Sequence, residues 1–106
     1  MTEKRSPGIY LIVEFDWPNP VDAETAKKAF HLHQVVKGAG WIQSAVAASH
    51  GVGKGAASIW IFKLKGYSAL ERLFRDPSDE VYKAYNDFFS AMPLVNTAIR
   101  EEVLFG

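Results

Sequence analysis

The chain has 106 residues, with 12 basic and 12 acidic side chains and no cysteine. Its length suits one ordinary domain, and its balanced charge provides no field that would attract nucleic acid or an anionic membrane surface. The absence of cysteine excludes a disulfide framework and thiolate chemistry. The charged start, followed by only a short apolar run, matches neither a signal peptide nor a membrane span. We therefore expect a soluble, cytoplasmic domain over residues 8–106, preceded by a flexible tail over residues 1–7.

A first strand is predicted over residues 8–17, where apolar side chains occupy every second position from Ile9 to Phe15. Prolines end it, and Asn19-Pro20 or Asp22 then supplies the start of a helix that runs to about residue 37. The helical period predicts one apolar side on this helix. That side contains Ala26, Ala29, Phe30, His33 and Val36.

Residues 41–50 carry small side chains and are predicted to form a second strand, and the glycine-rich residues 51–55 turn the chain back as a hairpin. The third strand, residues 58–64, is apolar on both of its faces, whereas a half-solvated strand would alternate apolar and polar residues. We therefore expect a central strand that helices cover on one face and a second copy of the chain covers on the other.

A short helix is predicted over residues 67–75, and a further helix begins near Asp76-Pro77 and runs to about residue 91. The last strand is predicted over residues 94–105. With right-handed crossovers, the resulting βαββαβ order predicts an α+β, ferredoxin-like sandwich. Its antiparallel four-stranded sheet would have the first and third strands in the middle.

Three passages carry a resemblance to the dimeric α/β barrel group: Gly40-Trp41 onward through the hairpin, the aromatic strand Ile59-Trp60-Ile61-Phe62, and Tyr67-Ser68-Ala69-Leu70-Glu71-Arg72-Leu73. The chain resembles the muconolactone isomerase-like, antibiotic-biosynthesis monooxygenase-like, EthD-like and stress-responsive barrel proteins in element order over residues 8–105. The resemblance implies a homodimer in which two ferredoxin-like sheets press together. It carries over no diagnostic catalytic motif, so it implies a fold and a partner but no activity.

The predicted topology brings several polar residues to one edge of the sheet: Glu14, Asp16, His50, Ser58 and Asn96. A histidine beside a carboxylate there could act as a general base, so His50 is a candidate catalytic residue. The alternative is an exposed hairpin histidine among surface acids. His33 is a second candidate, as an acid/base group in a pocket between helix and sheet. The alternative is a histidine at the edge of the core that bonds a backbone carbonyl.

No metal site and no cofactor are predicted. His31 and His33 lie two residues apart on a helix and point in nearly opposite directions, so they cannot share one ion. The segment of residues 51–55 resembles a phosphate loop only in its glycines, because it lacks the required spacing and hydroxyl residue and leads into a strand.

The chain carries an unusually large number of aromatic residues for its size. Large rings opposite the small residues of the second strand could leave a cavity between sheet and helices, where a polar group would hold one end of an apolar ligand. Close packing of the same rings would instead fill this space. The predicted ligand-binding residues are Tyr10, Trp41, Trp60, Phe62, Tyr85, Phe88 and Arg100.

These features favour a homodimeric protein that binds a small apolar or aromatic molecule, of a fatty-acyl or polyketide-like kind. One alternative is a cofactor-free monooxygenase or isomerase that uses His33 or His50. Another is a structural or assembly module without a ligand. The sequence leaves open whether the protein is an enzyme.

Overall fold

A computed structural model describes residues 7–105 of the chain. The predicted tail, residues 1–7, therefore lies outside the described residues apart from Pro7. The elements follow one another in the predicted order, which is confirmed. They are β1 (Ile9–Asp16), α1 (Ala23–Gly38), β2 (Ile42–Ser49), β3 (Ser58–Leu64), α2 (Tyr67–Arg75), α3 (Glu80–Phe89) and β4 (Leu94–Glu101).

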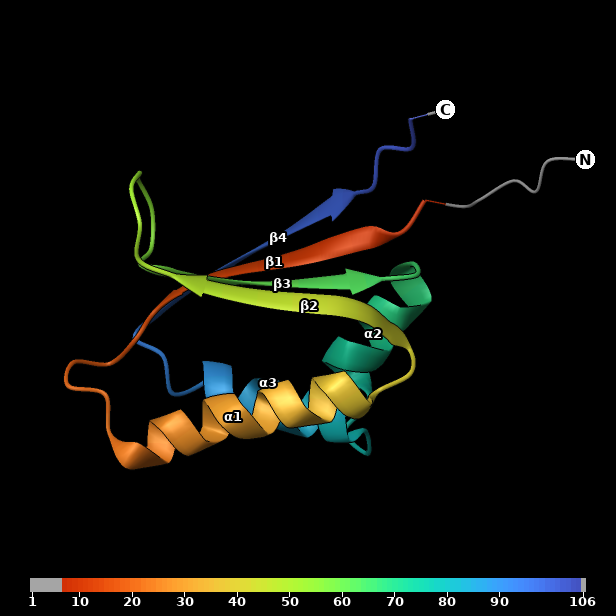
Figure 1. Cartoon of the computed structure of the whole chain (residues 1–106). Coiled ribbons are helices and arrows are strands. Elements are labelled where there is room, and N and C mark those ends of the chain that lie inside the picture. Colours follow the sequence, from red (N-terminus) through yellow and green to blue (C-terminus); the bar gives the residue numbers. More distant parts are fainter. Residues whose placement is uncertain (1–6, 106) are drawn as a thin grey trace, which may run out of the picture.

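The four strands form one antiparallel sheet in the order β2-β3-β1-β4, so β1 and β3 are the central strands, as predicted. The helices all lie on the same side of this sheet (Figure 1). This is the ferredoxin-like arrangement that the βαββαβ order predicts. The opposite side of the sheet, which we call the open face, is covered by none of the helices described within residues 7–105.

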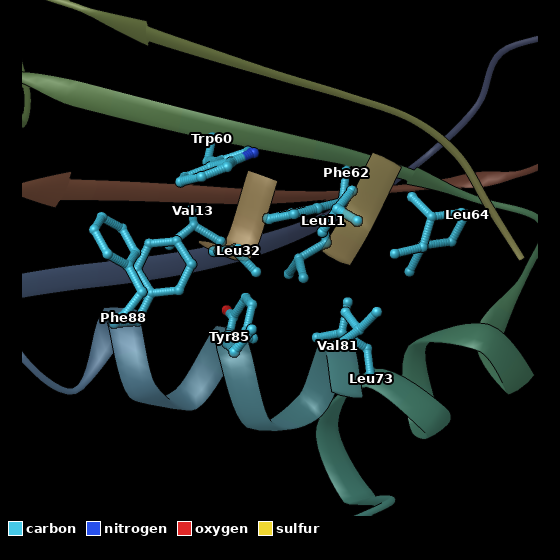
Figure 2. Close-up of a cluster of buried hydrophobic side chains, with 14 of the residues drawn as sticks. Leu11, Val13, Leu32, Trp60, Phe62, Leu64, Leu73, Val81, Tyr85 and Phe88 are labelled. Atoms are coloured by element: carbon cyan, nitrogen blue, oxygen red, sulfur yellow. The ribbon is translucent and has the colours of Figure 1, made fainter. Parts of the chain in front are cut away.

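The hydrophobic core lies between the sheet and the helices, where β1 and β3 direct every second side chain (Figure 2). Leu11, Val13 and Phe62 are fully buried there, opposite Leu32 of α1 and Phe88 of α3. Because side chains alternate along a strand, the residues between these positions face the other way.

The strand register identifies those residues. Ile61 of β3 pairs with Ile12 of β1 on one side and with Val46 of β2 on the other. Ile12 in turn pairs with Ala98 of β4. This apolar row crosses the middle of the open face, where Ile12, Ile61 and Ala98 are half-buried and Val46 is 61% exposed.

Helix α1 turns a different side to the core from the one predicted. Its buried residues are Thr25, Leu32 and Val36, whereas Phe30 is 62% exposed. The predicted side that included Ala26, Phe30 and His33 is therefore wrong. The sequence of α1 is weakly amphipathic, and Val36 belongs both to the predicted apolar stripe and to the one that is buried. Packing against the sheet favours the second stripe, which buries Leu32 completely.

Two predicted boundaries differ by more than two residues. Strand β4 ends at Glu101 and not at residue 105. The next residue, Glu102, donates its backbone N–H to the Gly8 carbonyl, and beyond this contact β1 has no further residue with which β4 could pair. Helix α3 begins after Asp79 and not after Asp76. The Asp79 carboxylate accepts a hydrogen bond from the Val81 amide and caps the helix.

Candidate functional site

Four of the predicted ligand-binding residues lie in the core. Trp60, Phe62, Tyr85 and Phe88 are between 0 and 7% exposed. Trp60 stacks on Phe62 at a centroid distance of 5.7 Å and meets Phe88 edge-on at 5.6 Å, while Phe62 lies 6.0 Å from Tyr85. Figure 2 shows these rings directed toward one another between the sheet and α3. Their packing contributes to the stability of the core.

Tyr10 and Arg100 lie on the other side of the sheet. They are cross-strand partners on the open face, two positions along from Ile12 and Ala98. The Lys63 ammonium lies 5.7 Å from the centroid of the Tyr10 ring. Six of the seven predicted ligand-binding residues are thus divided between the two faces of the sheet and form no common site.

Trp41 lines a pocket of about 580 Å³ at the end of the helical layer, which we call the helix-end pocket. It lies between the end of α1, the connection into β2, α2 and the start of α3. Its volume falls within the usual range for small-molecule sites. The lining residues are His31, Gln34, Val35, Gly38, Ala39, Gly40, Trp41, Arg72, Ser78, Asp79, Glu80 and Val81.

Arg72 of α2 is held from two directions in this pocket. Its guanidinium carbon lies 4.5 Å from the centroid of the Trp41 ring, within cation–π distance. Its Nε atom donates to Asp79 Oδ2 at 2.6 Å. The other carboxylate oxygen of Asp79 accepts from the Val81 amide at 2.8 Å, so the start of α3 fixes the arginine. The two contacts hold the guanidinium between the Trp41 ring and the Asp79 carboxylate.

The remaining donors of Arg72 are available to a ligand. Because Nε bonds Asp79, the two terminal NH₂ groups keep their donors, and residues 7–105 provide no acceptor for them. An arginine in this state can bind a carboxylate or carbonyl oxygen with fixed geometry. His31 adds an exposed imidazole to the same pocket, and Val35 and Trp41 add apolar wall.

Neither Arg72 nor His31 is among the residues that the sequence predicts for ligand binding. Arg72 stands in an amphipathic helix where an arginine normally faces solvent. Its partners Trp41 and Asp79 come from two other parts of the chain, and only the tertiary structure brings the three together. The available signal was Trp41 directly after Gly40, in the short connection between α1 and β2.

The two candidate catalytic histidines lie far apart in the fold. His33 is exposed on α1 and lines a groove of about 280 Å³ beside the start of β2. His50 follows β2 with a positive φ of 66°, is exposed, and donates its backbone N–H to the Ala57 carbonyl. A catalytic role for either histidine stays a prediction.

The polar edge predicted around the hairpin contains a connected set of hydrogen bonds. Asp16 accepts from the Ala57 amide at 2.8 Å, and Ser58 accepts from the Trp17 indole at 2.9 Å. The hydroxyls of Ser49 and Ser58 lie 2.7 Å apart. These contacts join the base of the hairpin to the end of β1, so they support the fold at this edge.

Within residues 7–105, no group of three or more His, Asp or Glu side chains is arranged to hold a metal ion. The helices described there are all too short or too polar to cross a membrane.

No family model matches the chain, and no curated protein matches it. Solved structures resemble it in fold. A dimeric ferredoxin-like protein of unknown function from Thermobifida fusca is 17% identical, with a TM-score of 0.64 over 98% of this chain and 97% of that one. A hypothetical Arabidopsis thaliana protein is 11% identical, with a TM-score of 0.69 over 100% and 96%. A Pseudomonas aeruginosa protein is 12% identical, with a TM-score of 0.56 over 98% and 100%. The ferredoxin-like fold is therefore shown.

Proposed function

We propose that this protein binds a small molecule with a flat apolar body and an acceptor group such as a carboxylate, and that it does so as a homodimer. The orientation of Arg72 carries the proposal. An arginine held by Trp41 and Asp79 presents two NH₂ groups to a pocket of about 580 Å³. Such a group loses little side-chain entropy when a ligand binds.

The walls of the pocket suit the rest of the ligand. Val35 and Trp41 provide apolar surface, and a flat ring would pack on the indole or beside it. Asp79 forms an ion pair with Arg72, so its carboxylate repels an acidic ligand less than an unpaired carboxylate would. His31 offers a second polar contact across the pocket. The arrangement favours an aromatic acid over a fully apolar molecule.

The homodimer rests on the open face. Its middle row is apolar, and no helix in the described part of the chain covers it; the row consists of Ile12, Ile61, Val46 and Ala98. Contiguous apolar surface of this kind marks an interaction site in soluble proteins. One of the solved neighbours is described as dimeric, which adds support. A stable pairing of two such faces would bury on the order of 1,200 Å² or more.

Calorimetric titration with 2-naphthoic acid tests the binding proposal. We expect measurable binding by the wild-type protein and a loss of roughly 10- to 100-fold for Arg72→Gln, the size of one charged hydrogen-bonding contact. Trp41→Leu should also weaken binding, because it removes both the ring surface and the support of Arg72.

Arg75→Gln is the matched control. Arg75 lies in the last turn of the same helix but does not line the pocket. Equal binding by the Arg72 and Arg75 variants would contradict the assigned role of Arg72. No binding of aromatic acids by the wild-type protein would favour the structural-module alternative.

A further inference from the structure

The helix-end pocket is lined by more carboxylates than guanidinium groups. Its titratable lining residues are His31, Arg72, Asp79 and Glu80. Arg72 and Asp79 form an ion pair with each other, with Arg72 Nε and Asp79 Oδ2 2.6 Å apart. With a neutral imidazole at His31, this pair leaves the Glu80 carboxylate unbalanced among the lining residues described within residues 7–105.

Glu80 is the first residue of α3 and directly follows the aspartate that holds Arg72. Its Cα atom therefore lies about 3.8 Å from that of Asp79. Glu80 is exposed, and within residues 7–105 its carboxylate makes no hydrogen bond and no ion pair. A free acceptor and the free donors of Arg72 thus border the same pocket.

The end of α1 adds partial negative charge to another wall of the pocket. Gly38, the last residue of this helix, lines the pocket, and no residue in the described part of the chain donates a hydrogen bond to its carbonyl. The carbonyl end of a helix carries about half an elementary negative charge, which favours a nearby cation. Lys37, the basic residue of this last turn, lines other grooves and not this pocket. The helix end therefore favours a positive group on the ligand.

A ligand that carries only a carboxylate would add to the excess of negative charge in the pocket. Its carboxylate would bind Arg72, but Glu80 and the end of α1 would repel it. An ammonium group beside the carboxylate removes this repulsion, because it can bind Glu80 while the carboxylate binds Arg72. In an α-amino acid the two groups share one carbon atom, so they suit an acid and a base that border the same small pocket.

We propose that the ligand of the helix-end pocket is an aromatic α-amino acid, and that Glu80 determines this specificity by binding the ammonium group. This inference rests on the proposed function, in which Arg72 binds a carboxylate and Trp41 contacts a flat apolar body. It narrows the ligand from aromatic acids in general to those that are zwitterions.

Calorimetric titration of the full chain with L-phenylalanine and with 3-phenylpropanoic acid tests the assignment. The two probes share the ring, the chain length and the carboxylate, and they differ in the ammonium group. We expect the wild-type protein to bind L-phenylalanine roughly 3- to 10-fold more tightly, which is less than a buried charged contact would give because Glu80 is exposed. Glu80→Gln should remove this preference, because the amide keeps the shape of the side chain without its charge.

Glu71→Gln is the matched control, because Glu71 precedes Arg72 in α2, is exposed and does not line the pocket. It removes the same charge from the chain and should keep the preference for L-phenylalanine. Equal binding of the two probes by the wild-type protein would overturn the role of Glu80, as would a preference that survives in Glu80→Gln or is lost equally in Glu71→Gln. In each of these cases the aromatic acids still bind, so the proposed function stands. If neither L-phenylalanine nor the aromatic acids bind, the proposed function fails and this inference fails with it.

Discussion

Strands β1 and β3 place apolar side chains on both faces of the sheet, but the two faces have different surroundings. On the helix face, Leu11, Val13 and Phe62 are completely buried. On the open face, Ile12 and Ile61 from the same two strands remain half-buried, and Val46 beside them is 61% exposed. Neighbouring residues of one strand therefore differ in burial only because they point in opposite directions.

This comparison separates two roles for apolar residues. The helix face supplies the free energy that holds the single chain together, because its side chains leave water on folding. The open face keeps apolar surface that residues 7–105 of the same chain leave uncovered. That surface is available for a partner, and the helix face is not.

The largest expected difference between the faces comes from charge at adjacent positions of β3. Phe62→Glu would bury an unpaired carboxylate in the core, which costs several kcal/mol. Because the free energy of unfolding of a whole domain is only roughly 5–15 kcal/mol, we expect an unfolded chain. Ile61→Glu should leave the fold intact and abolish dimerisation. Circular dichroism and sedimentation equilibrium distinguish these results.

Phe62→Leu and Ile61→Val serve as controls that keep both positions apolar, and both should remain folded. If Ile61→Glu unfolded the chain while Phe62→Glu left it folded, the assignment of the two faces would be reversed. If Ile61→Glu left the dimer intact, the open face would not be the interface.

A smaller difference is expected between serines on the two faces. Ser58 is 2% exposed on the helix face, and its hydroxyl accepts from the Trp17 indole. Ser58→Ala leaves that N–H without its acceptor and should lower the free energy of unfolding by about 1–3 kcal/mol. Ser44 is exposed and faces the open side, so Ser44→Ala should change it by less than about 0.5 kcal/mol. Urea titration measures both. Equal effects would show that the Trp17–Ser58 contact adds nothing to stability.

The smallest effect concerns pH and the buried tyrosine of α3. Burial raises the pKa of the Tyr85 hydroxyl above its ordinary value of 10.0. The folded chain therefore keeps the Tyr85 proton at pH values where the unfolded chain loses it. The contribution of the protonated Tyr85 hydroxyl to the free energy of unfolding is fully present below pH 10.0. It is lost as the pH rises from there toward the raised pKa.

Urea titrations of wild type and Tyr85→Phe at pH 8 and above pH 10 measure this contribution, since phenylalanine cannot ionise. The gap in unfolding free energy between the two proteins should shift in favour of the variant as the pH rises. A constant gap across this range would mean that Tyr85 ionises equally well in the folded chain.

Much of the fold follows from the sequence. The alternation of β1, the two-sided apolar character of β3 and the proline and glycine breaks predict the element order and the central strands correctly. The side of α1 that meets the sheet could not be predicted. Its two stripes have similar apolar character, and the choice depends on how Leu32 fits against β1 and β3.

The candidate site was less predictable than the fold. Trp41 was predicted for ligand binding, but Arg72 was not, because its orientation depends on Trp41 and on Asp79 at the start of another helix. Likewise, the sequence marks Tyr10 and Trp60 only as aromatic, and the register places one on the open face and the other in the core.

The sequence by itself determined which segments are strands and helices and that the central strands carry more apolar surface than the helices cover. Local patterns of hydrophobicity, glycine and proline act over a few residues, so they are visible in the chain. Only the tertiary structure decided which face each residue of β3 occupies and which side chains meet in the helix-end pocket. These depend on strand register and helix rotation, which are fixed by packing between segments distant in the chain.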